Sequence, residues 1–287
     1  MIKKDDLLVL SRKDELALKS PSNLAFMPYF FVQTNFPYTE VEGREFVRKN
    51  GNLTLSLYSP TGLPYGSLPR LVIAFIVTEA IRKKTREVHL GETLSEFLTR
   101  IGLGRTGGKN GTITRLRKQL NSLFTCFISC TSDWKHKGGG NIKSIANMLI
   151  ADEADLWWDP HTLSLYDESG EFCSYVILSE SFYNAINKAP IPVDFNAVLK
   201  LKQSPMAVDI YCWATYRMCY CHSRTFIPWE DLALQFGSIE SNLRKFKFRF
   251  KKHLVSVQKI YPDFKCDTSD PKGLVIFPSK TSIKKTK

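Results

Sequence analysis

The segment 239–262 constrains the fold most, because its apolar residues recur every three or four positions over nineteen residues. Such spacing places them along one stripe of a helix, and Ser238 is a suitable N-cap. The stripe consists of Ile239, Leu243, Phe246, Phe250, Leu254 and Val257. The other side carries the cations Arg244, Lys245, Arg249, Lys251 and Lys252. We therefore expect a helix that buries one face and offers the other to an anionic partner, for which DNA is the first candidate.

A strand is the competing interpretation of this segment. Phe246, Phe248 and Phe250 alternate with basic residues, as they would on a half-buried strand, but the alternation covers only six residues. The longer helical pattern is therefore favoured. In a helix Phe248 falls among the cations, where it could contact a thymine methyl or the DNA backbone, or pack against the wing of its own domain.

The charge of the chain fits an anionic partner without proving one. Forty Lys and Arg against twenty-eight Asp and Glu give a net charge of +12 over 287 residues. A soluble basic protein without such a partner would look the same. Residues 152–187 contain eight acidic residues and no Lys or Arg. We expect one surface to face DNA and another, acidic surface to avoid it.

Several classes of protein are disfavoured. Seven cysteines without a CxxC pair indicate reduced thiols, the start of the chain does not read as a signal peptide, and the apolar run 71–77 is too short for a membrane span. We expect a bacterial cytoplasmic protein that does not bind membranes. The Cys212, Cys219, Cys221 and His222 cluster reads as core thiols rather than metal ligands, and Asp152, Glu153 and Asp155 as a solvated or protein-binding acidic surface. We expect no metal and no cofactor.

No catalytic pattern stands out either. The glycine-rich loop 104–111 lacks the first glycine and the hydroxyl residue of a phosphate-binding loop, which argues against nucleotide binding. It reads equally well as a flexible turn or as a loop whose following helix start holds a DNA phosphate beside Lys109. No paired histidines accompany a tyrosine, as strand nicking would require. The expectation is a protein that is not an enzyme.

The same order of elements occurs twice. A core helix from Ser67 to about 84, a strand at 88–90, a helix from Thr93 to 102, a helix from Thr112 and a hairpin over 125–150 form the first unit. A helix over 204–221, a strand at 226–227, a helix from Pro228 to 237, the basic helix and a hairpin over 263–277 form the second. This is the order of a winged helix-turn-helix, whose third helix enters the major groove.

The predicted fold class is therefore α+β, with two tandem winged helix-turn-helix domains and an N-terminal arm. The predicted boundaries are 1–50 for the arm, 51–190 and 191–278 for the two winged-helix domains, and 279–287 for a basic tail, with Pro190 and Pro192 marking the junction. We expect dimerisation and DNA-backbone contacts in the first domain and the main DNA reader in the second.

The third helix of the first unit repeats the amphipathic pattern of the basic helix. Its expected buried face carries Ile113, Leu116, Leu120, Phe124 and Phe127, and its polar face carries Arg115, Lys118, Gln119 and Ser122. Arg pairs bidentately with guanine, and Asn or Gln with adenine. The predicted base-reading residues are Thr114, Arg115, Lys118, Gln119, Asn242, Arg244, Lys245 and Arg249. The predicted phosphate-binding residues are Lys109, Lys135, Lys137, Lys251, Lys252 and Lys272.

A linked set of short motifs is distributed over residues 26–278. They are 50–55 (NGNLTL), 62–70 (GLPYGSLPR), 78–80 (TEA), Leu90-Gly91, 106–108 with Gly111-Thr112, Arg115-Leu116, Gln119, Leu123-Phe124, Trp157-Trp158, Ser204-Pro205, 209–211 (DIY), Tyr216-Arg217, Pro228-Trp229 and 235–237 (QFG). Through these residues the chain resembles the plasmid-encoded RepA replication initiators, relatives of iteron-binding Rep proteins built from two winged helices.

The resemblance implies several properties that the residue pattern does not show. It implies binding to repeated double-stranded sites, or iterons, in a plasmid origin, and opening of the adjacent duplex with help from the host initiator DnaA. It also implies recruitment of the replicative helicase DnaB or its loader, a switch between monomer and dimer, and a dimer that often represses its own gene and so contributes to copy number control. A winged-helix transcriptional repressor without a replication role is the alternative.

Overall fold

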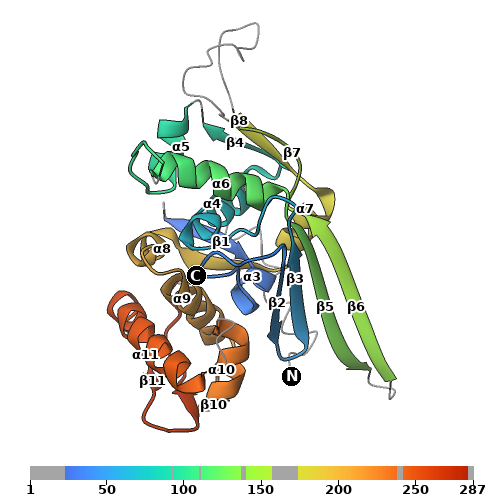
Figure 1. Cartoon of the computed structure of the whole chain (residues 1–287). Helices are drawn as coiled ribbons and strands as arrows, with labels where there is room; N and C mark the ends of the chain where they lie inside the picture. The colour runs from blue at the N-terminus through green and yellow to red at the C-terminus, as the bar shows by residue number, and fades with distance from the viewer. Residues whose placement is uncertain are drawn as a thin grey trace, which may run out of the picture.

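The computed structural model describes residues 23–91, 93–109, 111–136, 140–156, 174–237 and 242–283. Within these residues helices and short antiparallel sheets alternate along the chain, so the predicted α+β class is confirmed (Figure 1). The buried apolar side chains form one continuous cluster that runs from Leu24 to Ile276. The two halves of the described chain therefore share a core.

Two apolar helices lie at the centre of this core. Helices α4 (Ser67–Lys83) and α9 (Pro205–Met218) are buried on most of their surface, as expected of helices that are apolar nearly all round. Helix α9 begins where the sequence predicts, and Ser204 caps it, since its hydroxyl accepts the N–H of Ala207 at 3.2 Å. At α4 the cap position is Gly66 instead of the predicted Ser67.

A buried ion pair connects these two helices. Arg70 of α4 donates from Nε and Nη2 to the two carboxylate oxygens of Asp209 on α9, each at 2.7 Å. Its remaining N–H groups donate to the carbonyls of Phe36, Pro37 and Gly66. Arg70 is only 1% exposed, and a buried charge of this kind is tolerated when it is paired and fully hydrogen-bonded.

The predicted double order of elements is present. The first unit continues from α4 into β4 (Glu87–Gly91), α5 (Leu94–Arg100), α6 (Thr112–Phe124) and the hairpin of β5 (Phe127–His136) and β6 (Gly140–Leu149). The second continues from α9 into β10 (Thr225–Pro228), α10 (Trp229–Phe236), α11 (Leu243–Ile260), β11 (Cys266–Asp267) and β12 (Gly273–Ile276). Thr93 caps α5 by accepting the N–H of Glu96, as its sequence predicts.

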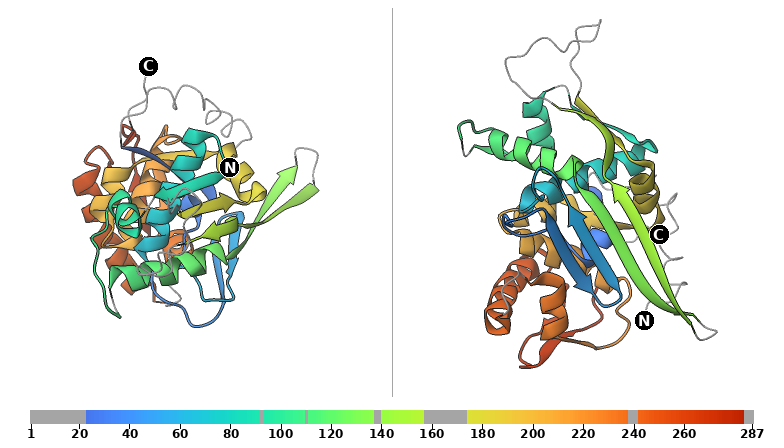
Figure 2. Two further views of the ribbon diagram at one scale, coloured as in Figure 1. Left: turned by 90° about the horizontal axis from the view of Figure 1, so that it is seen from above. Right: turned by 45° about the vertical axis from the view of Figure 1, so that its right-hand side comes forward.

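The two units differ in how their strands pair. In the second unit β10 joins its own hairpin, in the order β10-β12-β11. In the first unit β4 pairs with β8 (Ser174–Leu178), which also pairs with β7 (Ala151–Asp155). The hairpin of β5 and β6 instead extends a sheet with β3 (Leu53–Tyr58) and β2 (Glu45–Asn50), and projects from one side of the molecule (Figures 1 and 2).

Residues 23–50, predicted as an arm, contribute strands and core side chains. Strand β1 (Leu24–Pro28) pairs with β9 (Pro190–Asp194), and helix α3 (Tyr29–Gln33) buries Phe30, Phe31 and Val32. The two prolines expected to mark a junction thus lie in a paired strand, and helix α8 (Phe195–Leu201), which we did not predict, follows it. Helix α7 (Glu180–Lys188) is capped by Ser179, whose hydroxyl accepts the N–H of Phe182 at 3.1 Å. The domain boundaries stay a prediction.

Part of the acidic segment is described. Asp152 in β7 pairs with Arg86, and the hydroxyl of Tyr175 in β8 donates to Glu153 in β7 at 2.5 Å. The tryptophans at 157 and 158 and the rest of the acidic segment up to residue 173 lie outside the described residues.

Candidate nucleic-acid interface

Helix α11 confirms the helical interpretation of the basic segment. It begins after Asn242, whose side-chain oxygen accepts the N–H groups of Arg244 at 3.0 Å and Lys245 at 3.2 Å. These bonds satisfy two of the N–H groups that a helix start leaves without partners. Ser238, the predicted cap, lies outside the described residues. A strand over this segment is excluded.

The predicted apolar stripe fixes α11 to the body of the protein. Phe246, Phe250, Leu254 and Val257 are buried. The ring of Phe250 lies 5.8 Å from that of Trp229 and 5.5 Å from that of Phe236, both in edge-on arrangements that aromatic pairs favour. Because this stripe is held from α10, the opposite side of α11 necessarily faces away from the core.

That opposite side is cationic. Arg244, Lys245 and Lys252 are exposed, while Arg249 and Lys251 are half-buried. In the same stretch Phe248 is 72% exposed. Burial lowers the pKa of the His253 imidazole below its usual 6.5, and the charges of Lys252 and Arg249 lower it further. Its Nδ1 lies 3.1 Å from the hydroxyl of Ser204.

Lysines of α11 also hold the wing, the loop 268–272 between β11 and β12. Lys247 donates to the carbonyl of Pro271 at 2.9 Å, and Lys251 donates to that of Thr268 at 2.7 Å. Lys251 also lies over the Trp229 ring, 5.5 Å from its centroid. We expected Lys251 to bind phosphate, and the structure instead engages its ammonium with the wing. Lys247 was not predicted from the sequence to be a functional residue. It lies four residues before Lys251 on the same helix face, and this spacing could have indicated that the two lysines act together.

The turn of the wing is set by its own acidic side chains. Asp270 accepts the N–H of Lys272 at 2.7 Å, and Asp267 accepts the N–H and the hydroxyl of Ser269, each at 2.8 Å. The hydrogen bonds from Ser269 lower the pKa of the Asp267 carboxyl below its usual value. Lys272 itself is exposed at the tip, beside α11.

The glycine loop closes over the start of α6. The hydroxyl of Thr106 accepts the N–H of Thr112 at 2.9 Å, and its carbonyl accepts that of Ile113 at 3.3 Å. These N–H groups, which we considered as holders of a DNA phosphate, are therefore already bonded within the chain. Gly111, and not Thr112, is the cap residue, and a Cβ there would lie 2.3 Å from the carbonyl oxygen of Gly107. Only glycine fits this close approach.

The polar face of α6 is covered in part. Gln119 is 4% exposed, and its side-chain oxygen accepts the N–H of Tyr65 at 2.8 Å, so the prediction that it reads a base is wrong. Ser122, expected on the same exposed face, is buried as well. Lys118 is exposed but pairs with Glu40 at 2.5 Å and lies over the Tyr65 ring. The hydrogen bonds from Lys118 and the Tyr65 hydroxyl lower the pKa of Glu40.

The remaining predicted residues divide into three groups. Arg115, Lys109 and Thr114 are exposed, although the Thr114 hydroxyl donates to the carbonyl of Gly108 at 2.8 Å. Asn242 uses for capping the oxygen that a bidentate adenine contact needs, so that contact is not available to it. Lys137 and the side chain of Lys135 lie outside the described residues. Phe127, expected to be buried, is partly exposed on β5.

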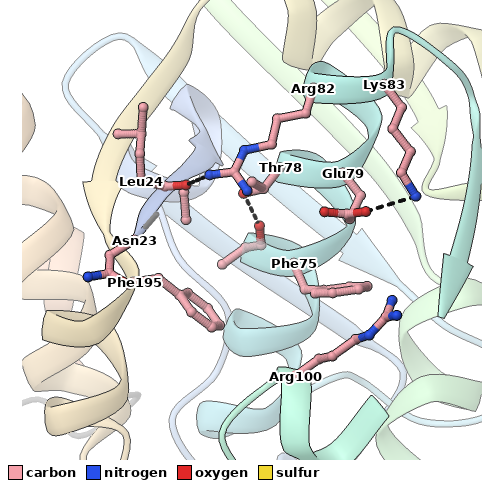
Figure 3. A pocket seen from close by; sticks show the side chains of 11 residues that line it. Asn23, Leu24, Phe75, Thr78, Glu79, Arg82, Lys83, Arg100 and Phe195 are labelled. Atoms are coloured by element: carbon pink, nitrogen blue, oxygen red, sulfur yellow. Dashed lines mark hydrogen bonds and ion pairs between the residues drawn. The ribbon is translucent and has the colours of Figure 1, made fainter. Parts of the chain in front are cut away.

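A second candidate site is a cavity of about 430 Å³ between α4, β1 and the start of α8 (Figure 3). Three cations line it, and each has an internal partner. Arg82 donates to the carbonyl of Leu24, Lys83 pairs with Glu79 at 3.0 Å, and Arg100 pairs with Glu96 at 2.5 Å. Among the described residues, no group of three His, Cys, Asp or Glu side chains is placed to hold a metal ion. The exposed cations of α11, Arg244, Lys245 and Lys252, are therefore the stronger candidate for a functional site.

Two of three comparisons with known proteins found a match. Among the helices of the described residues, none is both long and apolar enough to cross a membrane. A search of curated protein sequences gave no match. A solved structure of domains 2 and 3 of RctB, determined as selenomethionine derivatives, superposes with a TM-score of 0.55 at 9% sequence identity, covering 87% of this chain and 97% of that one. It shows a shared fold.

The family comparison is more specific, because it rests on sequence. The model of the plasmid-encoded RepA protein family matches residues 63–229, from the segment before α4 to the first residue of α10, which is more than half of the chain. The match covers all of the first repeated unit and the beginning of the second. The chain therefore belongs to the plasmid-encoded RepA protein family.

Proposed function

We propose that this protein initiates replication of a plasmid by binding repeated double-stranded sites, or iterons, at the plasmid origin. The observation that carries the proposal is the exposed cationic side of α11, with Arg244, Lys245 and Lys252 on a helix whose other side is locked into the core. Such a helix offers guanidinium and ammonium groups to base edges and phosphates at once. Membership of the plasmid-encoded RepA family supports the same function.

The second half is proposed to dock as a winged helix. Helix α11 enters the major groove, and the loop between β11 and β12 approaches the neighbouring backbone. The sheet order β10-β12-β11 and the bonds from Lys247 and Lys251 to the wing support this arrangement, because they hold wing and helix in one orientation. Arg244, Lys245 and Arg249 are the proposed base-reading residues of this half.

Phosphate contacts are assigned to Lys252 on α11 and Lys272 at the wing tip, both exposed. Replacing both by alanine should weaken binding to the repeats and to unrelated DNA alike, because phosphates carry no sequence information. The slope of log Kd against log salt should fall by about one for each lost contact. Lys188→Ala, at the exposed end of α7, is the control and should leave the slope unchanged. An unchanged slope in the double variant would remove both lysines from the interface.

The first half is proposed to bind beside the second on the same duplex. The loop 104–109 and α11 lie toward the same side of the molecule, away from the hairpin of β5 and β6 (Figures 1 and 2). Lys109 and Arg115 are the exposed cations available to a phosphate or a base there. With Gln119 buried and Lys118 paired, this half is expected to supply mainly backbone contacts.

Origin opening, contact with DnaA, and recruitment of DnaB or its loader complete the proposed function. The decisive experiment transforms cells with an otherwise replication-defective plasmid that carries this gene and its neighbouring repeats. Persistence of the plasmid, and its loss with Arg244→Ala, is the expected result. A repressor without a replication role would bind the same repeats and leave the plasmid unable to persist. In that case the repressor would replace the initiator as our conclusion.

The proposed function requires no catalysis by this chain. A nicking initiator would form a covalent tyrosyl link to one DNA strand. Incubating the protein with supercoiled origin DNA and magnesium should leave the DNA closed and the protein unmodified. A nicked circle that migrates with bound protein would contradict this part of the proposal.

Self-association is proposed to use the outer face of the sheet formed by β2, β3, β5 and β6. The large apolar side chains exposed on this face are Val47, Tyr58, Phe127, Ile145 and Leu149. Tyr58, Phe127 and Leu149 are direct neighbours across three strands. Among the described side chains of this face, the exposed charges balance, with Glu45 and Asp133 against Lys49 and Lys143. In a chain of net charge +12, an apolar face whose described charges cancel is where a second copy can approach with little repulsion.

Sedimentation velocity over a range of concentrations tests this surface. Ile145→Glu should weaken the dimer more than tenfold, because it buries a charge against apolar side chains. Leu234→Glu is the matched control, since Leu234 is equally exposed but lies on α10 outside the sheet. A dimer that tolerates Ile145→Glu, or a wild-type protein that stays monomeric throughout, would remove the sheet face from the proposal.

A further inference from the structure

Phe248 is exposed in a way that the fold does not require. It is 72% exposed, the highest value among the large apolar side chains in the described residues. One interpretation of the sequence was that its ring packs against the wing of its own domain, and the structure excludes this. The wing is held instead by Lys247 and Lys251, on either side of Phe248 in the sequence. The Phe248 ring is left facing solvent.

The surroundings of Phe248 indicate what kind of partner it faces. Arg244 precedes it and Lys252 follows it by four residues, so the three side chains form one stripe along α11, about 6 Å apart from one to the next. Both cations are exposed. An apolar protein groove that covered the ring would have to bury these charges too, at a high desolvation cost. A polyanion with an apolar group at its surface matches the stripe better.

The major groove of DNA is such a partner. Its edges display hydrogen-bonding groups, together with one apolar group, the C5-methyl of thymine. We propose that Phe248 is a specificity-determining residue that packs against a thymine methyl within the recognised repeat, while Arg244 and Lys252 contact bases or phosphates on either side. This inference rests on the proposed function of α11 as the DNA-reading helix. It adds an apolar contact to a site that was otherwise assigned to cations alone.

The test removes the methyl group and the ring separately and then together. Each thymine of one repeat is replaced in turn by deoxyuridine, which lacks only the methyl, and the Kd is measured by fluorescence anisotropy for wild type and for Phe248→Ala. Wild type should lose about fourfold in affinity at one or two thymines, as expected for burial of one methyl. Phe248→Ala should bind thymine-containing DNA with about the same loss and should show no further loss at those positions.

Val255→Ala is the matched control, because Val255 is also exposed on α11 but lies two turns further along. It should keep the wild-type response to deoxyuridine. Circular dichroism should show that both variants are folded, since neither replaced side chain is buried. Equal sensitivity of wild type and Phe248→Ala at every thymine would overturn the inference, as would insensitivity of wild type throughout. If wild type shows no preference for the repeats over unrelated DNA, the proposed function itself fails.

Discussion

Helices α6 and α11 arise from similar sequence patterns and present different surfaces. On α11 the exposed side keeps Arg244, Lys245 and Lys252 open to solvent. On α6 the corresponding side is partly covered, with Gln119 bonded to the backbone of Tyr65 and Lys118 paired with Glu40. The covering residues come from segments before the first repeated unit. The difference shows that an amphipathic pattern determines which side of a helix is apolar, but not whether its polar side stays free.

The strands show the same contrast between the halves. In the second half β10 pairs with β12, which also pairs with β11, and this gives a three-stranded sheet. In the first half β4 pairs with β8, and the hairpin of β5 and β6 joins β2 and β3 instead. The second half is thus arranged around one exposed helix, and the first half around an exposed sheet. We assign sequence-specific DNA contacts mainly to the second and self-association to the first.

The largest effect is expected from breaking the ion pair that joins the halves. Asp209→Ala should lower the free energy of unfolding by about 3–5 kcal/mol, because it leaves Arg70 buried without its carboxylate. Urea denaturation followed by circular dichroism measures this change. Asp231→Ala, on the exposed side of α10, should stay within about 0.5 kcal/mol of wild type. A loss below 1 kcal/mol for Asp209→Ala would show that the two halves do not depend on this contact.

A smaller effect is expected at the loop that distinguishes the first half. Gly111→Ala should destabilise the protein by about 1–3 kcal/mol, because its Cβ would overlap the carbonyl oxygens of Thr106 and Gly107. Gly107→Ala is the matched control, since a Cβ there meets nothing within 4 Å. Thermal melting of the two variants measures the difference. Equal melting temperatures would mean that the loop does not close over α6 in solution.

The variant Lys118→Ala tests whether the polar side of α6 contributes to DNA recognition. Because Lys118 is an exposed partner of Glu40, its loss should cost about 0–1 kcal/mol of stability. We expect no change in the preference for the repeats over unrelated DNA, measured by anisotropy at fixed salt. Loss of that preference would show that Lys118 breaks its pair with Glu40 and contacts a base, so that α6 also reads the DNA sequence.

The smallest effect concerns His253 on α11. Its pKa is lower in the folded protein than the usual 6.5, so the unfolded chain binds more protons as pH falls through that value. The stability contributed by neutral His253 is therefore complete above about pH 6.5 and is lost as the pH falls toward the folded-state pKa. Melting temperatures between pH 7.5 and 5.5 should decline less steeply in His253→Gln. Identical slopes in variant and wild type would exclude His253 as a source of the decline.

Local patterns in the sequence predicted much of the fold. The apolar stripe of α11, the capping of α5 by Thr93 and the double order of elements follow from spacing between neighbouring residues, and each is present. What could not be predicted depends on contacts between distant residues. Such contacts include the hydrogen bond between Gln119 and Tyr65, the pairing of β1 with β9, and the bond by which Lys251 holds the wing. Periodicity carries no information about such partners.

The central claim is that α11 reads the repeats and α6 does not, and a matched pair of arginine variants tests it most directly. The measured quantity is the ratio of the Kd for unrelated DNA to the Kd for one repeat, at a single salt concentration. Arg244→Ala should reduce this ratio by about tenfold or more, as loss of a bidentate guanine contact does, and Arg115→Ala should leave it nearly unchanged. A ratio that falls with Arg115→Ala and survives Arg244→Ala would contradict the account.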